Sequence, residues 1–242
     1  MRLRRHHDPV DLRRTWDAHA EEWARWAREP GHDSYWRFHR KAFFELLPRP
    51  GHLTVDIGCG EGRVDRDLIE RGHRVVAIDG SPTLARLAAQ GEPPVPVAAA
   101  DAAQLPVRTN SADLAVAFMS LQDIEDLDGA VAEAARVLAP GGRLCLAIVH
   151  PVNSAGEFTG EDAASPFVVA GSYLFERPYT DVIERDGRRA TFASEHRTLE
   201  TFSRALEAAG FVIEALREVS PDDPADRWSR IPMFLDVRAV KS

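Results

Sequence analysis

An alternating-glycine turn with acidic residues beside it is the part of this sequence best suited to bind a ligand. The apolar run 53–57 contains Asp56 near its end, and Gly58, Gly60 and Gly62 follow at alternate positions. A helical apolar pattern begins directly behind the glycines. A strand, a glycine turn and a helix bring bare backbone N–H groups and the positive helix end up to a ligand. Glycine leaves room for close approach and tolerates positive φ. These residues therefore predict a cofactor-binding turn.

Two further acids follow at later strand ends. The apolar run 74–78 ends in Asp79, about twenty residues after the turn, which is the spacing of a ribose-binding acid in a β–α–β unit. A carboxylate there can accept hydrogen bonds from both ribose hydroxyls. Ser81 then has the place of an N-cap for the next helix. A third apolar run, 95–100, ends in Asp101.

A dinucleotide-binding turn is the main alternative for the glycines. The pattern G-x-G-x-x-G would need its third glycine at position 63, where this chain has Arg63. Each acid taken alone is also compatible with an ordinary turn or helix cap, which aspartate favours. The three acids together, in order and with this spacing, favour a different cofactor site over both alternatives.

The turn and the ordered acids resemble motif I and the later strand ends of the class I S-adenosylmethionine-dependent methyltransferases. A Pro-Gly-Gly turn at 140–142, before another predicted strand, resembles this family too. The resemblance is to the small-molecule group of the ubiquinone/menaquinone type, also called methyltransferase type 11. It spans nearly all of residues 12–242 and is strongest over 53–149. It implies S-adenosyl-L-methionine as the cofactor.

The resemblance also implies which residues hold this cofactor. In the family, the strand-end acid and the glycine turn hold the amino-acid portion. The acid of the third strand, here Asp101, is assigned to the adenine amino group, and Ala102 offers a backbone contact. Position by position, the implied cofactor-binding residues are Asp56, Gly58, Cys59, Gly60, Arg63, Asp79, Gly80, Ser81, Asp101, Ala102, Met119, Ser120, Leu121 and Trp16.

The implied fold is α/β, with a Rossmann-like seven-stranded methyltransferase sheet of order 3-2-1-4-5-7-6 in which strand 7 is antiparallel. N-terminal helices are expected before this sheet, and an aromatic, partly β insertion is expected after strand 5. We predict four parts: an N-terminal helical lid (1–50), a cofactor-binding core (51–149), a substrate-cover insertion (150–198), and a C-terminal helix with the closing strands of the same core (199–242).

Periodicity and turn residues support the two outer parts. Apolar residues recur at steps of three or four from Leu12 to Ala27, with Trp16 and Trp23 among them, which indicates one face of an amphipathic helix. These tryptophans are predicted to belong to a lid over the cofactor, and plain packing onto the sheet is an equal alternative. Within the insertion, Asp186-Gly187 between two strand-like runs is a strong hairpin signal.

Two histidines are candidates for a general base. His150 ends the fifth predicted strand, at the edge where open α/β sheets bind ligands. His196 begins the segment His-Arg-Thr-Leu-Glu-Thr-Phe, which resembles the substrate-side segment of this group. Histidine titrates near neutrality, so it can take a proton from a hydroxyl or ammonium acceptor. The alternative for either imidazole is a structural hydrogen bond to a backbone carbonyl.

Composition narrows the partners and the compartment. The net charge of −8 argues against nucleic acid, whose binding depends on Lys and Arg. No apolar run approaches the length of a membrane span, so no membrane partner is expected. The chain has only two cysteines, Cys59 and Cys145, so no disulfide framework is predicted and the cytoplasm is the default location. No Cys/His metal spacing is visible, and no metal is expected.

Together these features predict an S-adenosylmethionine-dependent methyltransferase. The expected reaction is in-line transfer of a methyl group to an O, N or C atom of a small metabolite. The aromatic insertion favours a flat or aromatic substrate. Two alternatives stay open: a protein of the same fold that binds S-adenosylmethionine and catalyses another reaction, or one with a non-catalytic binding role.

Overall fold

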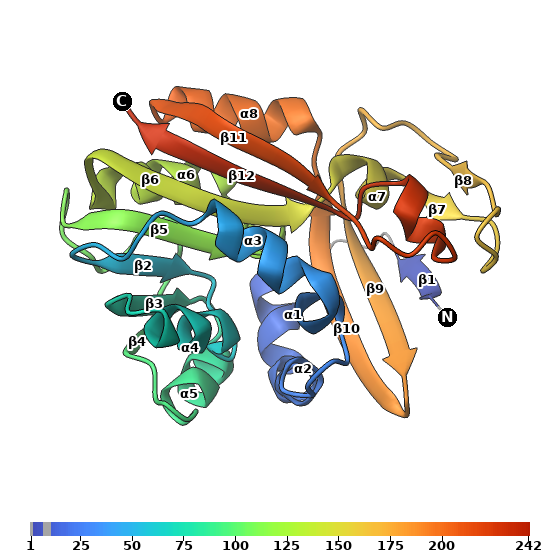
Figure 1. The fold of residues 1–242 in the computed structure, drawn as a ribbon, viewed down its shortest axis with the longest axis horizontal. Helices are drawn as coiled ribbons and strands as arrows, with labels where there is room; N and C mark the ends of the chain where they lie inside the picture. The colour runs from blue at the N-terminus through green and yellow to red at the C-terminus, as the bar shows by residue number, and fades with distance from the viewer. Residues whose placement is uncertain (1, 7–10) are drawn as a thin grey trace.

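The computed structural model of the chain describes residues 2–6 and 11–242, and its centre is a seven-stranded sheet (Figure 1). From edge to edge the strands are β11 (Phe211–Val219), β12 (Phe234–Lys241), β6 (Leu138–Val149), β5 (Ala112–Phe118), β2 (Thr54–Ile57), β3 (Val75–Asp79) and β4 (Val97–Ala99). β12 runs antiparallel to both of its neighbours, β6 and β11, and the pairs from β6 to β4 are parallel. The predicted order and the antiparallel seventh strand are therefore confirmed.

The sheet is buried because helices cover both of its faces. The covering helices are α3 (Arg40–Leu46), α4 (Arg63–Glu70), α5 (Pro82–Ala89), α6 (Leu127–Val137) and α8 (Leu199–Ala208). Residues of α6 and α8 pack with Val55 and Ile57 in one apolar cluster, and residues of α3 and α4 pack with Leu114 and Val116 in another. A parallel strand covered on both sides needs a continuous apolar run, which is the pattern seen before the glycine turn.

The N-terminal part differs from the helical lid predicted for 1–50. Residues Arg2–His6 form a strand, β1, that pairs with the later strand β9 (Arg177–Arg185), while residues 1 and 7–10 of the predicted lid lie outside the described residues. The single amphipathic helix expected from Leu12 to Ala27 is two helices, α1 (Leu12–Ala18) and α2 (Ala20–Ala27), because the backbone leaves helical geometry at His19. A π-helical turn over Tyr35–His39 then leads into α3.

The insertion after β6 contains the predicted hairpin. β9 and β10 (Arg188–His196) are antiparallel and are joined through Asp186 and Gly187, whose φ angles are 52° and 71°. Positive φ at both central residues is what a tight hairpin turn requires. The rest of the insertion contains α7 (Pro151–Ala155) and a short antiparallel pair, β7 (Glu157–Phe158) with β8 (Phe167–Val168). In Figure 1 the hairpin starts beside the ends of the main-sheet strands and extends past α1 and α2.

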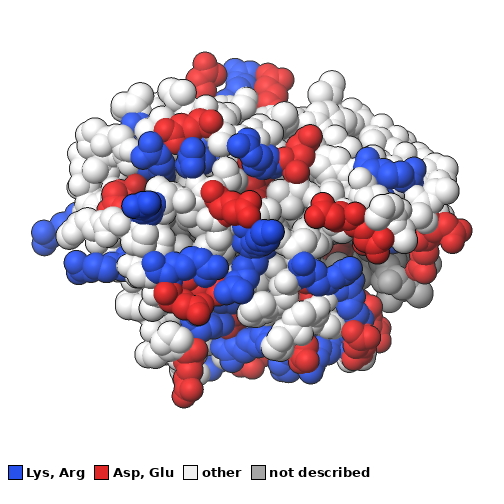
Figure 2. Space-filling view, viewed as in Figure 1, with Lys and Arg blue, Asp and Glu red and all other residues white. Residues whose placement is uncertain are grey.

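Charged side chains of both signs cover the face of the molecule drawn in Figure 2, where Lys and Arg lie interspersed with Asp and Glu. Within the described part of the chain, no helix is long and apolar enough to cross a membrane.

Candidate functional site

A cavity of about 430 Å³ lies at the carboxyl ends of the parallel strands. Its walls come from the glycine turn after β2, the ends of β3 and β5, the first helices, and the hairpin β9–β10. This is the edge where open α/β sheets bind ligands. Twelve of the predicted cofactor residues line it: Trp16, Gly58, Cys59, Gly60, Arg63, Asp79, Gly80, Ser81, Asp101, Ala102, Met119 and Ser120.

The glycine turn is shaped by close contact with neighbouring elements. Gly58 has φ +75°, and a Cβ atom there would lie 2.4 Å from the Cβ of Ser120. The hydroxyl of Ser120 donates to the carbonyl of Ile57 at 2.6 Å, which ties the end of β5 to the turn. At Gly60, with φ +61°, a Cβ would come 3.3 Å from Nε1 of Trp23 in α2. Larger residues would therefore displace either the strand end or α2.

Asp79 links the turn to the end of β3. Its Oδ2 accepts from the backbone N–H of Gly60 at 2.7 Å, and its Oδ1 accepts from that of Ser81 at 2.8 Å. Burial raises the pKa of Asp79 to about 6, and these two donors oppose the rise. The carboxyl group is thus held by the backbone at the cavity wall, where its oxygens can also accept from a ligand hydroxyl.

Asp56 is placed differently from the sequence prediction. It does not line the cavity; its carboxyl is fully buried and interacts with that of Asp65, the third residue of α4. Burial raises the pKa of Asp56 to about 7 and raises that of Asp65 well above its ordinary value. Repulsion between two buried, ionised carboxyls favours keeping one of them protonated. Asp56 is therefore absent from the cavity wall, and no pattern in the sequence indicated its interaction with Asp65.

The end of β5 carries an unusual backbone and an unused acceptor. Met119 has φ 57°, a rare value for a non-glycine residue. The amide of Gln122 donates from Nε2 to the carbonyl of Met119 at 2.6 Å, and its Oε1 has no hydrogen bond within the described residues. A buried acceptor without a partner at a cavity wall suits a ligand donor. Leu121, also predicted to bind cofactor, is buried in the core and does not line the cavity.

Asp101 and Asp123 are the other carboxyls at the strand ends. Asp101 lines the cavity and accepts from the N–H of Ala103 at 2.9 Å. Asp123 accepts from the hydroxyl of Ser194, in β10, at 2.6 Å. Burial raises the pKa of Asp123 well above its ordinary value. This carboxyl therefore joins the sheet edge to the hairpin.

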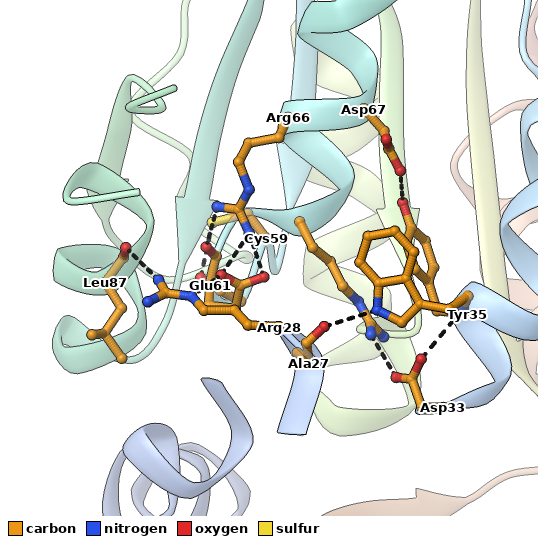
Figure 3. A network of polar contacts seen from close by, with 12 residues as sticks. Ala27, Arg28, Asp33, Tyr35, Cys59, Glu61, Arg66, Asp67 and Leu87 are labelled. Atoms are coloured by element: carbon orange, nitrogen blue, oxygen red, sulfur yellow. Dashed lines mark hydrogen bonds and ion pairs between the residues drawn. The ribbon is translucent and has the colours of Figure 1, made fainter. Parts of the chain in front are cut away.

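Three arginines lie around the glycine turn, and of these only Arg63 lines the cavity. Arg63, predicted to bind cofactor, lies 2.5 Å from Asp33 and stacks over the rings of Trp23 and Tyr35 at 4.9 and 4.4 Å. Beside it, Arg28 and Arg66 both pair with the buried Glu61, as Figure 3 shows. In the same figure the hydroxyl of Tyr35 points to Asp67, to which it donates. No pattern in the sequence indicated Asp33 or Tyr35 at this site, because both lie far from the turn along the chain.

The first helix is tied both to the turn after β3 and to the hairpin. Arg13 donates to the carbonyl of Gly80 at 2.7 Å, and Asp17 accepts from the hydroxyl of Ser81 at 2.5 Å. The indole of Trp16 donates to the carbonyl of Ala193, in β10, at 2.8 Å. Trp16 makes edge-to-face contacts with Trp23 and Phe192. Phe192 also contacts Trp23 and Trp26 edge to face.

The two predicted catalytic histidines lie outside the cavity lining. His196 is fully buried, with Nδ1 2.6 Å from the Ser154 hydroxyl and Nε2 2.8 Å from the carbonyl of Tyr173. His150 accepts at Nδ1 from the N–H of Val152 at 3.1 Å, and its Nε2 lies 3.2 Å from Glu218. Burial lowers the pKa of His150. Both rings have their nitrogens engaged, so this geometry counts against the predicted role as a general base and favours the structural alternative.

No group of three or more His, Cys, Asp or Glu side chains in the described ranges is arranged to hold a metal ion.

The chain is similar to known methyltransferases. Residues 55–146 match a family model described as a methyltransferase domain. The demethylmenaquinone methyltransferase of Corynebacterium kroppenstedtii is 36% identical over 114 residues, which cover 47% of this chain and 48% of that protein. The chain thus spans about half the length of this curated relative.

Solved structures extend the similarity over most of the chain. An S-adenosylmethionine dependent methyltransferase from Mesorhizobium loti has a TM-score of 0.70 and 27% identity, covering 86% of this chain and 98% of that one. A 1,6-didemethyltoxoflavin-N1-methyltransferase from Burkholderia thailandensis has a TM-score of 0.62 and covers 99% of this chain and 96% of its own. At 21% identity, this similarity shows the fold alone.

Proposed function

We propose that this chain is a class I S-adenosylmethionine-dependent methyltransferase and that it methylates a small molecule. The premise is the match of residues 55–146 to a methyltransferase domain. The observation that carries the proposal is the joint placement of the glycine turn, Asp79 and Asp101 around one cavity at the carboxyl edge of the sheet. The match to the demethylmenaquinone methyltransferase covers about half of that protein. It supports the presence of the domain, and the substrate is a separate proposal.

When bound, S-adenosylmethionine supplies a methyl group on a positively charged sulfur. We assign its ribose hydroxyls to Asp79, its adenine amino group to Asp101 with Ala102, and its amino-acid portion to the turn at Gly58 and Gly60. The fit is supported by Asp79, whose oxygens face the turn, and by the unpartnered acceptor at the wall beside Met119. Backbone and side-chain acceptors that are fixed in advance need little reorganisation on binding.

We propose a flat or aromatic metabolite as the methyl acceptor. Aromatic and apolar side chains also line the cavity, among them Phe38, Trp228, Met233 and Phe234. Such walls bind a planar ring through apolar area and edge-to-face contacts. They also exclude water, and an enclosure of this kind disfavours the charged sulfonium relative to its neutral product. Well-oriented reactants can gain roughly 7–11 kcal/mol over free encounter.

We further propose that residues 11–50 act as a lid and that the hairpin β9–β10 covers the acceptor. The contacts of Trp16 and Asp17 with β10 and with the turn after β3 support this, because they close the cavity from two sides. We place the protein in the cytoplasm, where thiols such as the buried Cys59 and Cys145 stay reduced.

The proposal is tested by binding and turnover measured on the same preparation. Calorimetry with S-adenosylmethionine tests the site, and formation of S-adenosylhomocysteine with a panel of phenols, quinols and heteroaromatic amines tests the reaction. In Asp79→Asn the charged acceptor is lost, so we expect binding weaker by about 1.5–3 kcal/mol, a rise in Kd of about 10- to 150-fold.

His73→Gln is the matched control, because His73 bonds Thr54 at the opposite end of the sheet and does not line the cavity. Its affinity for S-adenosylmethionine should equal that of the wild type. Binding without turnover on any acceptor would favour the non-catalytic alternative, and affinity for NADH in place of S-adenosylmethionine would overturn the cofactor assignment.

A further inference from the structure

A buried histidine–aspartate pair, whose histidine lines the cavity, was not singled out by the sequence. Nε2 of His39, the last residue of the π-helical turn, is 2.7 Å from Oδ1 of Asp236 in β12. The exposed fractions are 1% for His39 and 0% for Asp236. His39 lines the cavity beside Phe38 and Phe234.

The ring of His39 is fixed in one orientation. It stacks on Phe234 with ring centroids 4.2 Å apart and an interplanar angle of 9°. Its centroid lies 4.8 Å from that of Phe118, the last residue of β5. A carboxylate bonded to one ring nitrogen sets the tautomer, because it accepts from the N–H form of that nitrogen. Asp236 therefore places the hydrogen on Nε2 and leaves the lone pair on Nδ1.

Nδ1 of His39 has no hydrogen-bond partner among the described residues. This distinguishes His39 from His150 and His196, whose two nitrogens are both engaged. A lone pair on a ring that lines a cavity is available to a ligand proton, and a buried carboxylate behind the ring stabilises the imidazolium that would result.

A purely structural role explains this pair poorly. Burying a carboxylate is costly, and a well-packed apolar pair of similar volume is often at least as stable. The second oxygen of Asp236, Oδ2, has no hydrogen bond within the described part of the chain. His39 also stands on a π-helical turn, a rare geometry that occurs often at functional sites.

We propose that His39 is the general base of the methyl transfer and that Asp236 is its positioning residue, an inference that rests on the proposed function. The acceptor is a hydroxyl or protonated amine. A bond forms between the acceptor atom and the methyl carbon, the sulfur–methyl bond breaks, and its electron pair stays on sulfur as the neutral thioether. The acceptor's proton passes to Nδ1 of His39, and water then carries it away.

His39→Gln tests the base directly. The glutamine amide can still donate to Asp236, and it has no basic nitrogen. We expect kcat to fall by about 10²- to 10⁴-fold, with the Kd for S-adenosylmethionine within about twofold of the wild type. His73→Gln, a buried histidine remote from the cavity, should keep the wild-type kcat. If His39→Gln binds S-adenosylmethionine and keeps the wild-type kcat, the inference is wrong.

Nitrogen-detected NMR of the imidazole provides a second test that needs no turnover. The wild type should show His39 with Nε2 protonated and Nδ1 bare, and Asp236→Asn should shift the ring toward the other tautomer. The same variant should lower kcat by about tenfold or more while binding of S-adenosylmethionine is unchanged.

A wild-type His39 protonated at Nδ1 would overturn the dyad whatever the outcome of the activity assays. Absence of turnover in the wild type, together with a bare Nδ1, would instead count against the proposed function.

Discussion

At the scale of single residues, the most informative feature is the pair of carboxyls beneath the glycine turn. Asp56 and Asp65 are both fully buried, and burial raises the pKa of Asp56 from 3.8 to about 7. Between about pH 4 and pH 7 the folded state therefore binds a proton that the unfolded state has lost. The contribution of this pair to the free energy of unfolding is present at low pH and is lost as the pH rises through about 7.

Asp65→Asn should relieve this penalty. The amide can donate to the ionised Asp56, a hydrogen bond to a charged group worth about 1.5–3 kcal/mol. We expect a higher free energy of unfolding than the wild type at pH 8, by up to about 3 kcal/mol, and a smaller difference at pH 5. Urea titration at both pH values measures this.

Asp126→Asn is the control for that experiment, because Asp126 is an exposed N-cap of α6 and asparagine caps equally well. It should change stability little at either pH. An equal loss of stability in Asp65→Asn at pH 5 and pH 8 would contradict the raised pKa of Asp56 as the source of the pH dependence.

Residue by residue, the structure places the predicted acids and the predicted bases differently. Asp79 and Asp101 line the cavity because a strand end and its spacing can be seen in the chain. His150 was favoured for a similar strand-end position, yet its ring nitrogens bind Val152 and Glu218. The pair of His39 and Asp236 leaves no local pattern in the sequence, because the two residues are 197 positions apart.

At the scale of elements, the cavity is closed in part by two short helices, α1 and α2. α1 has seven residues and α2 has eight, and short helices are marginal unless they are packed against something. Their packing partners are β10 and the turn after β3, both of which border the cavity. A ligand in the cavity should therefore order these helices.

Hydrogen exchange should show this ordering. With saturating S-adenosylhomocysteine, amides of residues 12–27 and 188–196 should exchange more slowly, by about tenfold, because the open forms of the lid are depopulated. Amides of α6, in the core, serve as the internal reference and should change little. Trp16→Phe, which lacks the indole donor to Ala193, should weaken the protection of 12–27. Unchanged exchange in the lid would contradict the proposed closure.

The elements themselves were predictable to different degrees. The hairpin was found because Asp186-Gly187 is a strong local signal, and its φ values agree. The break at His19 and the π-helical turn were not found, since the apolar periodicity of the sequence continues through both positions. The pairing of β1 with β9 joins segments about 175 residues apart, beyond any local pattern.

At the scale of the whole molecule, the cofactor site joins nearly every part of the fold. The cavity wall draws on α1, α2, the strand ends of the sheet, the hairpin and the segment before β12. Ligand binding should thus stabilise the chain as one unit. At a concentration 100 times its Kd, a ligand adds about 2.7 kcal/mol to the free energy of unfolding.

This predicts a rise in Tm of about 5–10 °C with S-adenosylhomocysteine for a chain of this size. NADH at the same concentration should leave Tm unchanged, since the turn has Arg63 where the dinucleotide pattern needs glycine. Scanning calorimetry measures both. A rise with NADH alone would return the dinucleotide interpretation to first place.

The hydrogen bond between Trp16 and Ala193 also has a consequence for synthesis on the ribosome. The two residues are 177 positions apart, so at about 5–20 residues per second the second emerges roughly 10–35 s after the first. Throughout that interval the tryptophans of α1 and α2 have no hairpin to cover them. The nascent chain thus carries an uncovered aromatic surface while the sheet is still being made. Transiently exposed surface of this kind makes a chain prone to aggregation.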